Sequence, residues 1–258
     1  MRSTRLRLSA GAFFALGLAA CGDSGGTGHV NLQLSTRPKP GAVALSASAA
    51  PVTLGGDEIV IEAVDIVLRK IRFGGVAGGA CDGDAGTAAG GEAEDCGEFR
   101  TGPELFALPL EEGVVPTYTA TVPVGSYRQI QFQIHRPTDE TGDAELLAAH
   151  PDFNGTSIRV TGTYQKAGES APVPFVYTTD LTSVLTVELE APIDVADGEE
   201  LAMTLAFQTA GWFVNASGDG LVDPATALDG QPQEALVEQN IRSSVRAFQD
   251  EDGDGAAD

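Results

Sequence analysis

Cationic, aromatic and cysteine residues are all scarce in this chain of 258 residues. Lysine and arginine number 15 against 37 aspartates and glutamates, which gives a net charge of -22. So large an excess of acid argues against nucleic acid or an anionic lipid surface as the partner, because both would be repelled. Aromatic residues make up 6% of the chain, and this disfavours a ligand cleft lined by aromatic side chains.

Catalytic motifs are absent as well. The sequence contains no G-x-S-x-G, no H-E-x-x-H and no P-loop. Its three histidines, His29, His135 and His150, fall in separate segments, and the alternation around His135 places this residue on the solvent face of a strand. We therefore expect no enzymatic activity. A triad built from distant residues, or a hydrolase with a catalytic metal, is the alternative.

The N-terminus has the layout of an export signal. Arg2, Arg5 and Arg7 precede an apolar run that is too short to span a bilayer, which needs about 20 residues. The run ends in Leu-Ala-Ala-Cys21, which resembles the lipobox of bacterial lipoproteins. The resemblance implies that residues 1–20 are removed and that the Cys21 sulfur carries a lipid. Residues 21–28 would form a flexible tether. A plain signal peptide with a chance cysteine is the alternative.

The residue after Cys21 is glycine rather than aspartate. By resemblance to known lipoprotein sorting, this favours the outer membrane of the bacterial cell envelope over the inner membrane. The two other cysteines, Cys81 and Cys96, enclose an acidic, glycine-rich loop. An oxidising compartment would pair them, and closing the loop would stabilise the fold by about 3 kcal/mol. A metal role for these thiols is disfavoured, because no third cysteine or nearby histidine completes a zinc site.

Residues 29–213 alternate between apolar and polar positions in short runs, which is typical of half-buried strands. The clearest run has Ile130, Phe132 and Ile134 on one face and glutamines on the other. Residues 58–73 predict one long strand with a bulge near Asp65, or two strands in succession. About eight strands with one apolar face each predict an all-β fold of two packed antiparallel sheets, an immunoglobulin-like or prealbumin-like sandwich. A closed barrel is the second choice.

A resemblance supports this fold class. Residues 104–134 contain a leucine-rich strand, a P-x-G-x-Y turn formed by Pro123, Gly125 and Tyr127, and an alternating strand. This segment resembles an uncharacterised domain of bacterial lipoproteins, the DUF4382-type domain, and the same turn recurs in prealbumin-like sandwiches. The resemblance implies a β-sandwich and implies no activity.

The last nine residues resemble an EF-hand or dockerin-like calcium loop. The aspartates stand at the first, third, fifth and ninth positions of the loop, Gly255 stands at the sixth, and a backbone carbonyl would fill the seventh. The predicted ligands are Asp250, Asp252, Asp254, Ala256 and Asp258. Calcium takes six to eight oxygens, and the glutamate expected at the twelfth position is missing, so affinity should be weak. A solvated acidic terminus is the alternative.

A weaker copy of the pattern occurs earlier in the C-terminal segment, residues 214–258, with Gly220 at the turn position. Its predicted ligands are Asn215, Ser217, Asp219, Leu221 and Asp223. A glycine-rich turn capped by Asn and Asp is the alternative. Between the two loops Val237, Ile241, Val245 and Phe248 share one face of a predicted helix.

These features together predict a non-enzymatic protein that is anchored to the cell envelope through its N-terminal lipid and binds calcium weakly. Nucleic acid is excluded as a partner, whereas an envelope protein or a glycan is compatible with the sequence. The alternative is a solute- or glycan-binding module that uses the loops at one end of the sandwich.

Overall fold

The computed structural model describes residues 26–36, 51–75, 98–110, 115–255 and 257. Twelve strands are found there. They are β1 (Thr27–Ser35), β2 (Val52–Leu54), β3 (Asp57–Gly75), β4 (Glu98–Arg100), β5 (Glu104–Ala107), β6 (Val115–Pro123), β7 (Gly125–Ile134), β8 (Ile158–Gln165), β9 (Val173–Thr179), β10 (Ser183–Val195), β11 (Glu200–Phe207) and β12 (Val245–Gln249). The helices are α1 (Ala144–Ala149) and α2 (Glu234–Ser243), and the 3-10 turns are η2 (Thr141–Asp143), η3 (Pro151–Phe153), η4 (Thr209–Gly211) and η5 (Pro224–Thr226).

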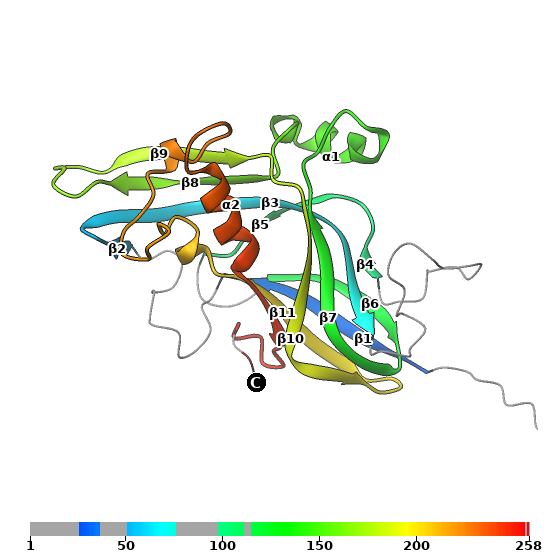
Figure 1. Cartoon of the computed structure of the whole chain (residues 1–258). Helices are drawn as coiled ribbons and strands as arrows, with labels where there is room; N and C mark the ends of the chain where they lie inside the picture. Colours follow the sequence, from blue (N-terminus) through cyan, green and yellow to red (C-terminus); the bar gives the residue numbers. More distant parts are fainter. Residues whose placement is uncertain (1–25, 37–50, 76–97, 111–114, 256, 258) are drawn as a thin grey trace, which may run out of the picture.

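The strands form one mixed sheet that curls into a half-barrel (Figure 1). Its order is β6-β1-β11-β12-β10-β7-β3-β8-β9, with β2, β4 and β5 paired to β3. The mostly-β class is therefore confirmed, whereas the arrangement as two antiparallel sheets is not, because β1 pairs with β11 and β10 with β12 in parallel. Within the described strands β6 and β9 do not pair with each other, so the sheet does not close.

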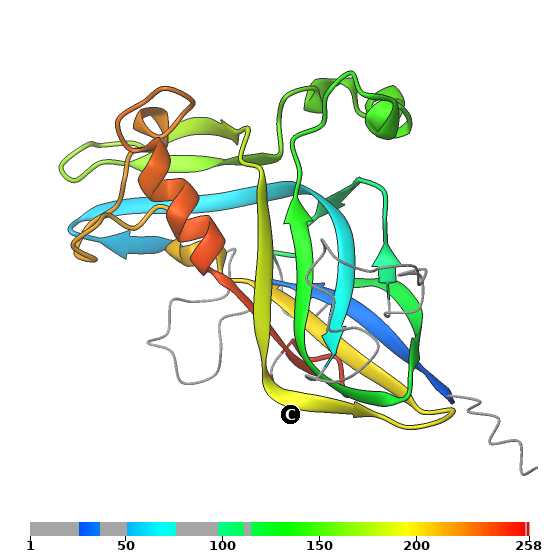
Figure 2. The ribbon, with the colours of Figure 1, turned by 45° about the vertical axis from the view of Figure 1, so that its right-hand side comes forward.

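Strand β3 is the element around which the sheet bends (Figure 2). Its first half pairs with β8 and its second half with β7. The predicted long strand with a bulge is confirmed, with irregularities on both sides of Asp65, one between Ile61 and Ala63 and one between Arg69 and Arg72. Bulges bend a strand and increase its twist. The bent β3 can therefore pair with both β8 and β7, although these two strands diverge.

Buried apolar side chains form one large core cluster. Ile130, Phe132 and Ile134 are fully buried there, as the alternation in this run predicted. Val237 and Ile241 of α2 belong to the same core. Val245 and Phe248 do not continue the helix as predicted, because α2 ends at Ser243 and both residues lie in β12. The helical spacing thus predicted Val237 and Ile241 correctly, but it wrongly assigned Val245 and Phe248 to the same helix.

The C-terminal segment shares the sheet and the core with the rest of the chain. Strand β12 lies between β11 and β10. The indole nitrogen of Trp212 donates a 2.8 Å hydrogen bond to the Ser244 hydroxyl, and both side chains are buried. Among the described residues no helix is long and apolar enough to cross a membrane.

The turn between β6 and β7 is closed by a tyrosine. The Tyr127 hydroxyl donates a 2.8 Å hydrogen bond to the carbonyl oxygen of Pro123. Burial raises the pKa of Tyr127, because the phenolate would be poorly solvated. The P-x-G-x-Y spacing therefore positions a hydroxyl that fixes this turn.

A small lobe, residues 135–157, separates β7 from β8 and contains α1. Leu146 and Phe153 pack there against Val67 of β3. Val67 accepts a backbone hydrogen bond from His135 and donates one to Ser157. The two ends of the lobe are therefore held at the point of β3 where β7 and β8 diverge.

Candidate metal centre

The C-terminal loop begins where β12 ends. The backbone N–H of Asp250 donates a 3.2 Å hydrogen bond to the Ala202 carbonyl of β11, which continues the strand pairing by one residue. Gly253 and Gly255 then reverse the chain with φ angles of 69° and 82°. Glycine adopts positive φ without the steric cost that other residues incur. Gly255 therefore makes the turn that the sixth position of the calcium-loop pattern requires.

Asp250 is fully buried, with 0% of its surface exposed. Its Oδ2 atom accepts hydrogen bonds from the Thr204 hydroxyl at 2.7 Å and from the Gly255 N–H at 3.0 Å. Its Oδ1 atom accepts one from the Asp254 N–H at 3.1 Å. No basic side chain pairs with this carboxylate in the part of the chain that the structure describes. A buried carboxylate is costly unless it is hydrogen-bonded or compensated by opposite charge.

Asp250, Asp252 and Asp254 bring their carboxylates together. Each offers one oxygen, and these oxygens lie within 4.8 Å of one another. Two ligands of a single calcium ion, each about 2.3 to 2.6 Å from it, lie at most about 5 Å apart. Asp252 and Asp254 are exposed, so an ion can enter from solvent. The set therefore fits calcium in donor chemistry and spacing. The remaining predicted ligands, Ala256 and Asp258, lie outside the described residues.

The first acidic loop is arranged differently. Its Asn215 and Ser217 side chains hydrogen-bond to Asp219 Oδ1 at 3.0 and 2.6 Å, and these bonds lower the pKa of Asp219. The positive φ belongs to Gly218 rather than to Gly220, so the turn glycine is not where the calcium pattern needs it. Asp219 Oδ1 therefore accepts hydrogen bonds within the turn. This arrangement matches the alternative interpretation, a glycine-rich turn capped by polar side chains.

The two other residues predicted to bind metal in this loop have structural contacts. Leu221 is buried and forms a β-bridge with Val214. Asp223 caps η5, its Oδ1 atom accepting a 2.9 Å hydrogen bond from the Ala225 N–H. The structure thus brings Asn215, Ser217 and Asp219 together without Asp223.

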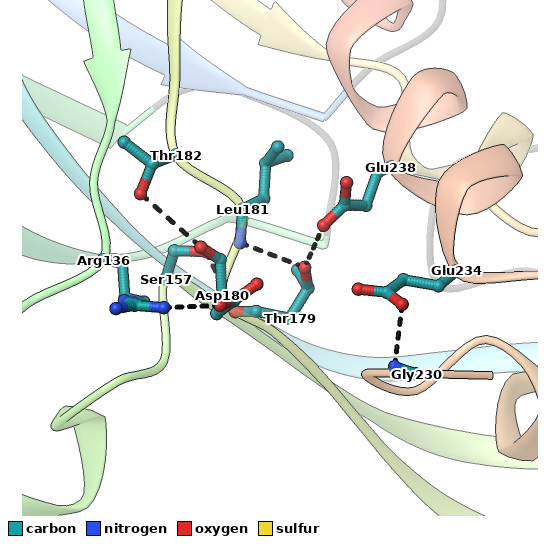
Figure 3. A network of polar contacts seen from close by, with 9 residues as sticks. All are labelled: Arg136, Ser157, Thr179, Asp180, Leu181, Thr182, Gly230, Glu234 and Glu238. Atoms are coloured by element: carbon teal, nitrogen blue, oxygen red, sulfur yellow. Dashed lines mark hydrogen bonds and ion pairs between the residues drawn. The ribbon is translucent and has the colours of Figure 1, made fainter.

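A second group of three acids lies at the N-terminal half of α2. Asp180, Glu234 and Glu238 each place an oxygen within 4.8 Å of the others. Arg136 pairs with Asp180 at 2.6 Å (Figure 3). Arg242 pairs with Glu238 at 2.9 Å. With two arginines against three carboxylates, most of the charge is already compensated. We interpret this group as a network that ties α2 to the end of β9.

A buried histidine–aspartate pair lies in the lobe. His135 Nε2 lies 2.8 Å from Asp143 Oδ1, and the Thr138 N–H donates to Asp143 Oδ2 at 2.8 Å. The prediction that His135 faces solvent is wrong, because the lobe covers this part of the sheet and leaves only 5% of the residue exposed. Burial lowers the pKa of His135. The pKa of Asp143 is also lowered: burial, which raises it, is outweighed by the Thr138 and His135 hydrogen bonds.

Several residues of these sites were not identifiable from the sequence. Thr204 falls in an apolar strand and gives no local signal of its contact with Asp250, and the Asp180 group joins residues more than 50 positions apart. Cys21, Cys81 and Cys96 lie outside the described residues.

The chain was compared with models of protein families, with curated proteins and with solved structures. None of the three comparisons finds a match. The fold and the candidate metal centre therefore define only a broad class. The chain is a mostly-β protein with a curled mixed sheet and an acidic loop at its C-terminal end.

Proposed function

We propose that the chain is a non-enzymatic, lipid-anchored protein of the bacterial cell envelope that binds calcium weakly through its C-terminal loop. The observation that carries the calcium proposal is the buried carboxylate of Asp250 beside Asp252 and Asp254. A divalent cation there would compensate the charge of Asp250, with which no described basic side chain pairs. The lipid anchor rests on the lipobox-like end of residues 1–21.

The calcium that we propose has a stabilising role. Asp250 is hydrogen-bonded to Thr204 of β11, and it directly follows β12. An ion that binds the folded loop and not the unfolded chain raises the free energy of unfolding by mass action. Occupancy would therefore hold the C-terminal strand in the middle of the sheet.

Calorimetric titration of the full chain in detergent tests the metal proposal. Wild-type protein should bind calcium with Kd on the order of 10⁻⁴ to 10⁻³ M. The double variant Asp252→Ala/Asp254→Ala should give no heat beyond dilution. Flat traces for both proteins would refute calcium binding at this loop.

A matched control keeps the net charge equal. The variant Asp197→Ala/Asp229→Ala removes two exposed carboxylates outside the loop and should bind calcium as the wild type does. Equal loss of binding in this control would show general attraction to an acidic surface. Mass spectrometry of protein from a bacterial host tests the anchor, which an unmodified Cys21 on an unprocessed chain would refute.

A further inference from the structure

The lobe between β7 and β8, residues 135–157, has few buried contacts with the sheet. Its apolar side chains Leu146 and Phe153 pack with Val67 in a small cluster that is separate from the main core. Most other side chains of α1 and of the turns beside it are exposed. Regions with few buried apolar contacts open at a lower free energy than the whole fold. The lobe can therefore open while the sheet stays folded.

The ends of the lobe form a neck that fixes where an opening begins. The Gly155 N–H donates a 2.8 Å hydrogen bond to the Pro137 carbonyl oxygen. Below this bond, both ends of the lobe are hydrogen-bonded to the backbone of Val67. Above it lies α1, a helix of six residues, which is too short to be stable in water without packing partners. Opening therefore means that residues 138–154 leave the sheet and unfold together.

One buried polar pair joins the closed lobe to the end of β7. His135, the first residue after β7, places Nε2 2.8 Å from Oδ1 of Asp143 in η2. Only 5% of the histidine and 1% of the aspartate are exposed. Because a carboxylate accepts hydrogen bonds and does not donate them, the neutral imidazole carries its proton on Nε2. The other nitrogen, Nδ1, is buried and has no hydrogen-bond partner in the described part of the chain.

Protonation of His135 is therefore unfavourable while the lobe is closed. A second proton would make Nδ1 a buried N–H donor without an acceptor, which is costly. Arg69 of β3 also acts against protonation, whereas Asp143 and Glu140 act in its favour. Burial, together with Arg69, outweighs the two acids and lowers the pKa of His135. In an open lobe the imidazole is solvated and takes up the proton near its ordinary pKa of about 6.5.

The other charged groups of the lobe and of the strands beside it are paired with other residues or exposed. Asp139, Glu145 and His150 of the lobe are exposed, so opening changes their surroundings little. The pairs are Arg159 with Asp65 and Asp152, Arg136 with Asp180, and Glu104 with Tyr118. Between pH 7.5 and 5.5, His135 is thus the histidine of the lobe whose protonation depends on opening.

We propose that the lobe is a pH-sensitive flap: residues 138–154 detach from β3 when Nδ1 of His135 takes up a proton. Acid favours the open state because only there is the imidazolium solvated. Below about pH 6.5 the ratio of open to closed molecules should rise by up to about tenfold per pH unit, until the pH reaches the pKa of the closed state. Opening exposes Phe153, whose ring centre lies 4.4 Å from the Arg159 guanidinium in the closed lobe. The proposal requires neither calcium nor a lipid anchor.

Hydrogen exchange of the full chain in detergent, measured by mass spectrometry at pH 7.5, 6.5 and 5.5, tests the proposal. Protection of residues 138–154 is first corrected for the pH dependence of intrinsic exchange. It should be lower than the protection of β7 at every pH, because the lobe opens without global unfolding. It should also fall severalfold between pH 7.5 and 5.5. His135→Gln keeps a donor for Asp143 and does not titrate, so its protection should not change with pH.

His150→Gln is the matched control, because it removes an exposed histidine of the same lobe and should keep the wild-type pH dependence. Arg69→Gln removes the charge that opposes protonation and should make the fall smaller, which gives a second test if His135→Gln does not fold. The proposal is refuted if wild-type protection of residues 138–154 is independent of pH, or if His135→Gln shows the wild-type fall. Equal protection of the lobe and of β7 would also refute it, because the lobe would then open only in global unfolding.

Discussion

The hydroxyl of Thr204 donates a 2.7 Å hydrogen bond to Oδ2 of Asp250, and both residues are fully buried. Thr204 lies in the middle of β11, whereas Asp250 is the first residue after β12. The contact therefore fixes the carboxylate that begins the acidic loop against the interior of the sheet. Any ion bound by Asp250 is coupled through this bond to the packing of β11.

The substitution Thr204→Val should lower the free energy of unfolding. It removes the hydroxyl donor and leaves a buried charged oxygen with one partner fewer, which costs about 1 to 3 kcal/mol. Calcium affinity should fall as well, because the carboxylate loses the bond that orients it. Urea unfolding and calorimetric titration measure the two effects.

Thr204→Ser serves as the control for that experiment. Serine keeps the hydroxyl and loses only a methyl group, so most of the stability and all detectable calcium binding should be retained. If the serine and valine variants unfold at the same urea concentration, the hydrogen bond does not contribute and the loss belongs to packing.

The first acidic loop should not contribute to calcium binding. Asp219→Ala removes a carboxylate that is hydrogen-bonded to Asn215 and Ser217, so the calcium titration should match that of wild-type protein. Asp254→Ala, which removes a carboxylate of the C-terminal loop, should weaken the titration. A weaker titration in the Asp219 variant would show that this loop holds an ion after all.

Periodicity predicted the strands well because burial of one face is a local property. Val30, Leu32 and Leu34 of β1 are buried, and the polar residues between them are more exposed. The sequence could not indicate which strands are neighbours. His29 of β1 pairs in parallel with Glu200 of β11, and alternation carries no information about a partner that is so distant.

The C-terminal acidic loop was also predictable only in part. The spacing of Asp250, Asp252 and Asp254 predicted that their oxygens would come together, and the structure brings them within 4.8 Å. Burial of Asp250 was not predictable, because it depends on β12 entering the sheet beside β11. The error at His135 has a similar origin, since alternation identifies a face of a strand but not what covers it.

Stability should fall as pH decreases through the titration range of His135. Burial holds the folded pKa of this residue below its ordinary value of 6.5, so the unfolded chain binds the proton more readily. The contribution of His135 to the free energy of unfolding is thus fully present above about pH 6.5. It is lost as pH falls from there toward the folded pKa, at no more than about 1.4 kcal/mol per pH unit. Urea unfolding at pH 7.5, 6.0 and 5.0 measures this slope.

His135→Gln provides the comparison for the pH experiment, because glutamine can donate to Asp143 and does not titrate. Its unfolding free energy should change less between pH 7.5 and 5.0 than that of wild-type protein. Arg69 and Glu140 act on the same imidazole with opposite sign and are unchanged in the variant. Parallel pH profiles for the two proteins would show that other groups cause the acid sensitivity. The pKa of Asp143 is lowered, so protonation of this residue should cause a separate loss of stability only below about pH 4.

Lys70 occupies a backbone conformation that favours glycine. Its φ angle is 54°, it lies at the second irregularity of β3, and its side chain is exposed. A left-handed conformation costs a residue with a side chain about 1 to 2 kcal/mol, and glycine avoids most of this cost but loses more freedom on folding. Lys70→Gly should therefore stabilise the protein by about 0.5 to 1 kcal/mol in urea unfolding. Lys70→Ala keeps the Cβ atom and should give no gain, so an equal gain from alanine would assign the effect to the lost lysine charge instead of to the backbone.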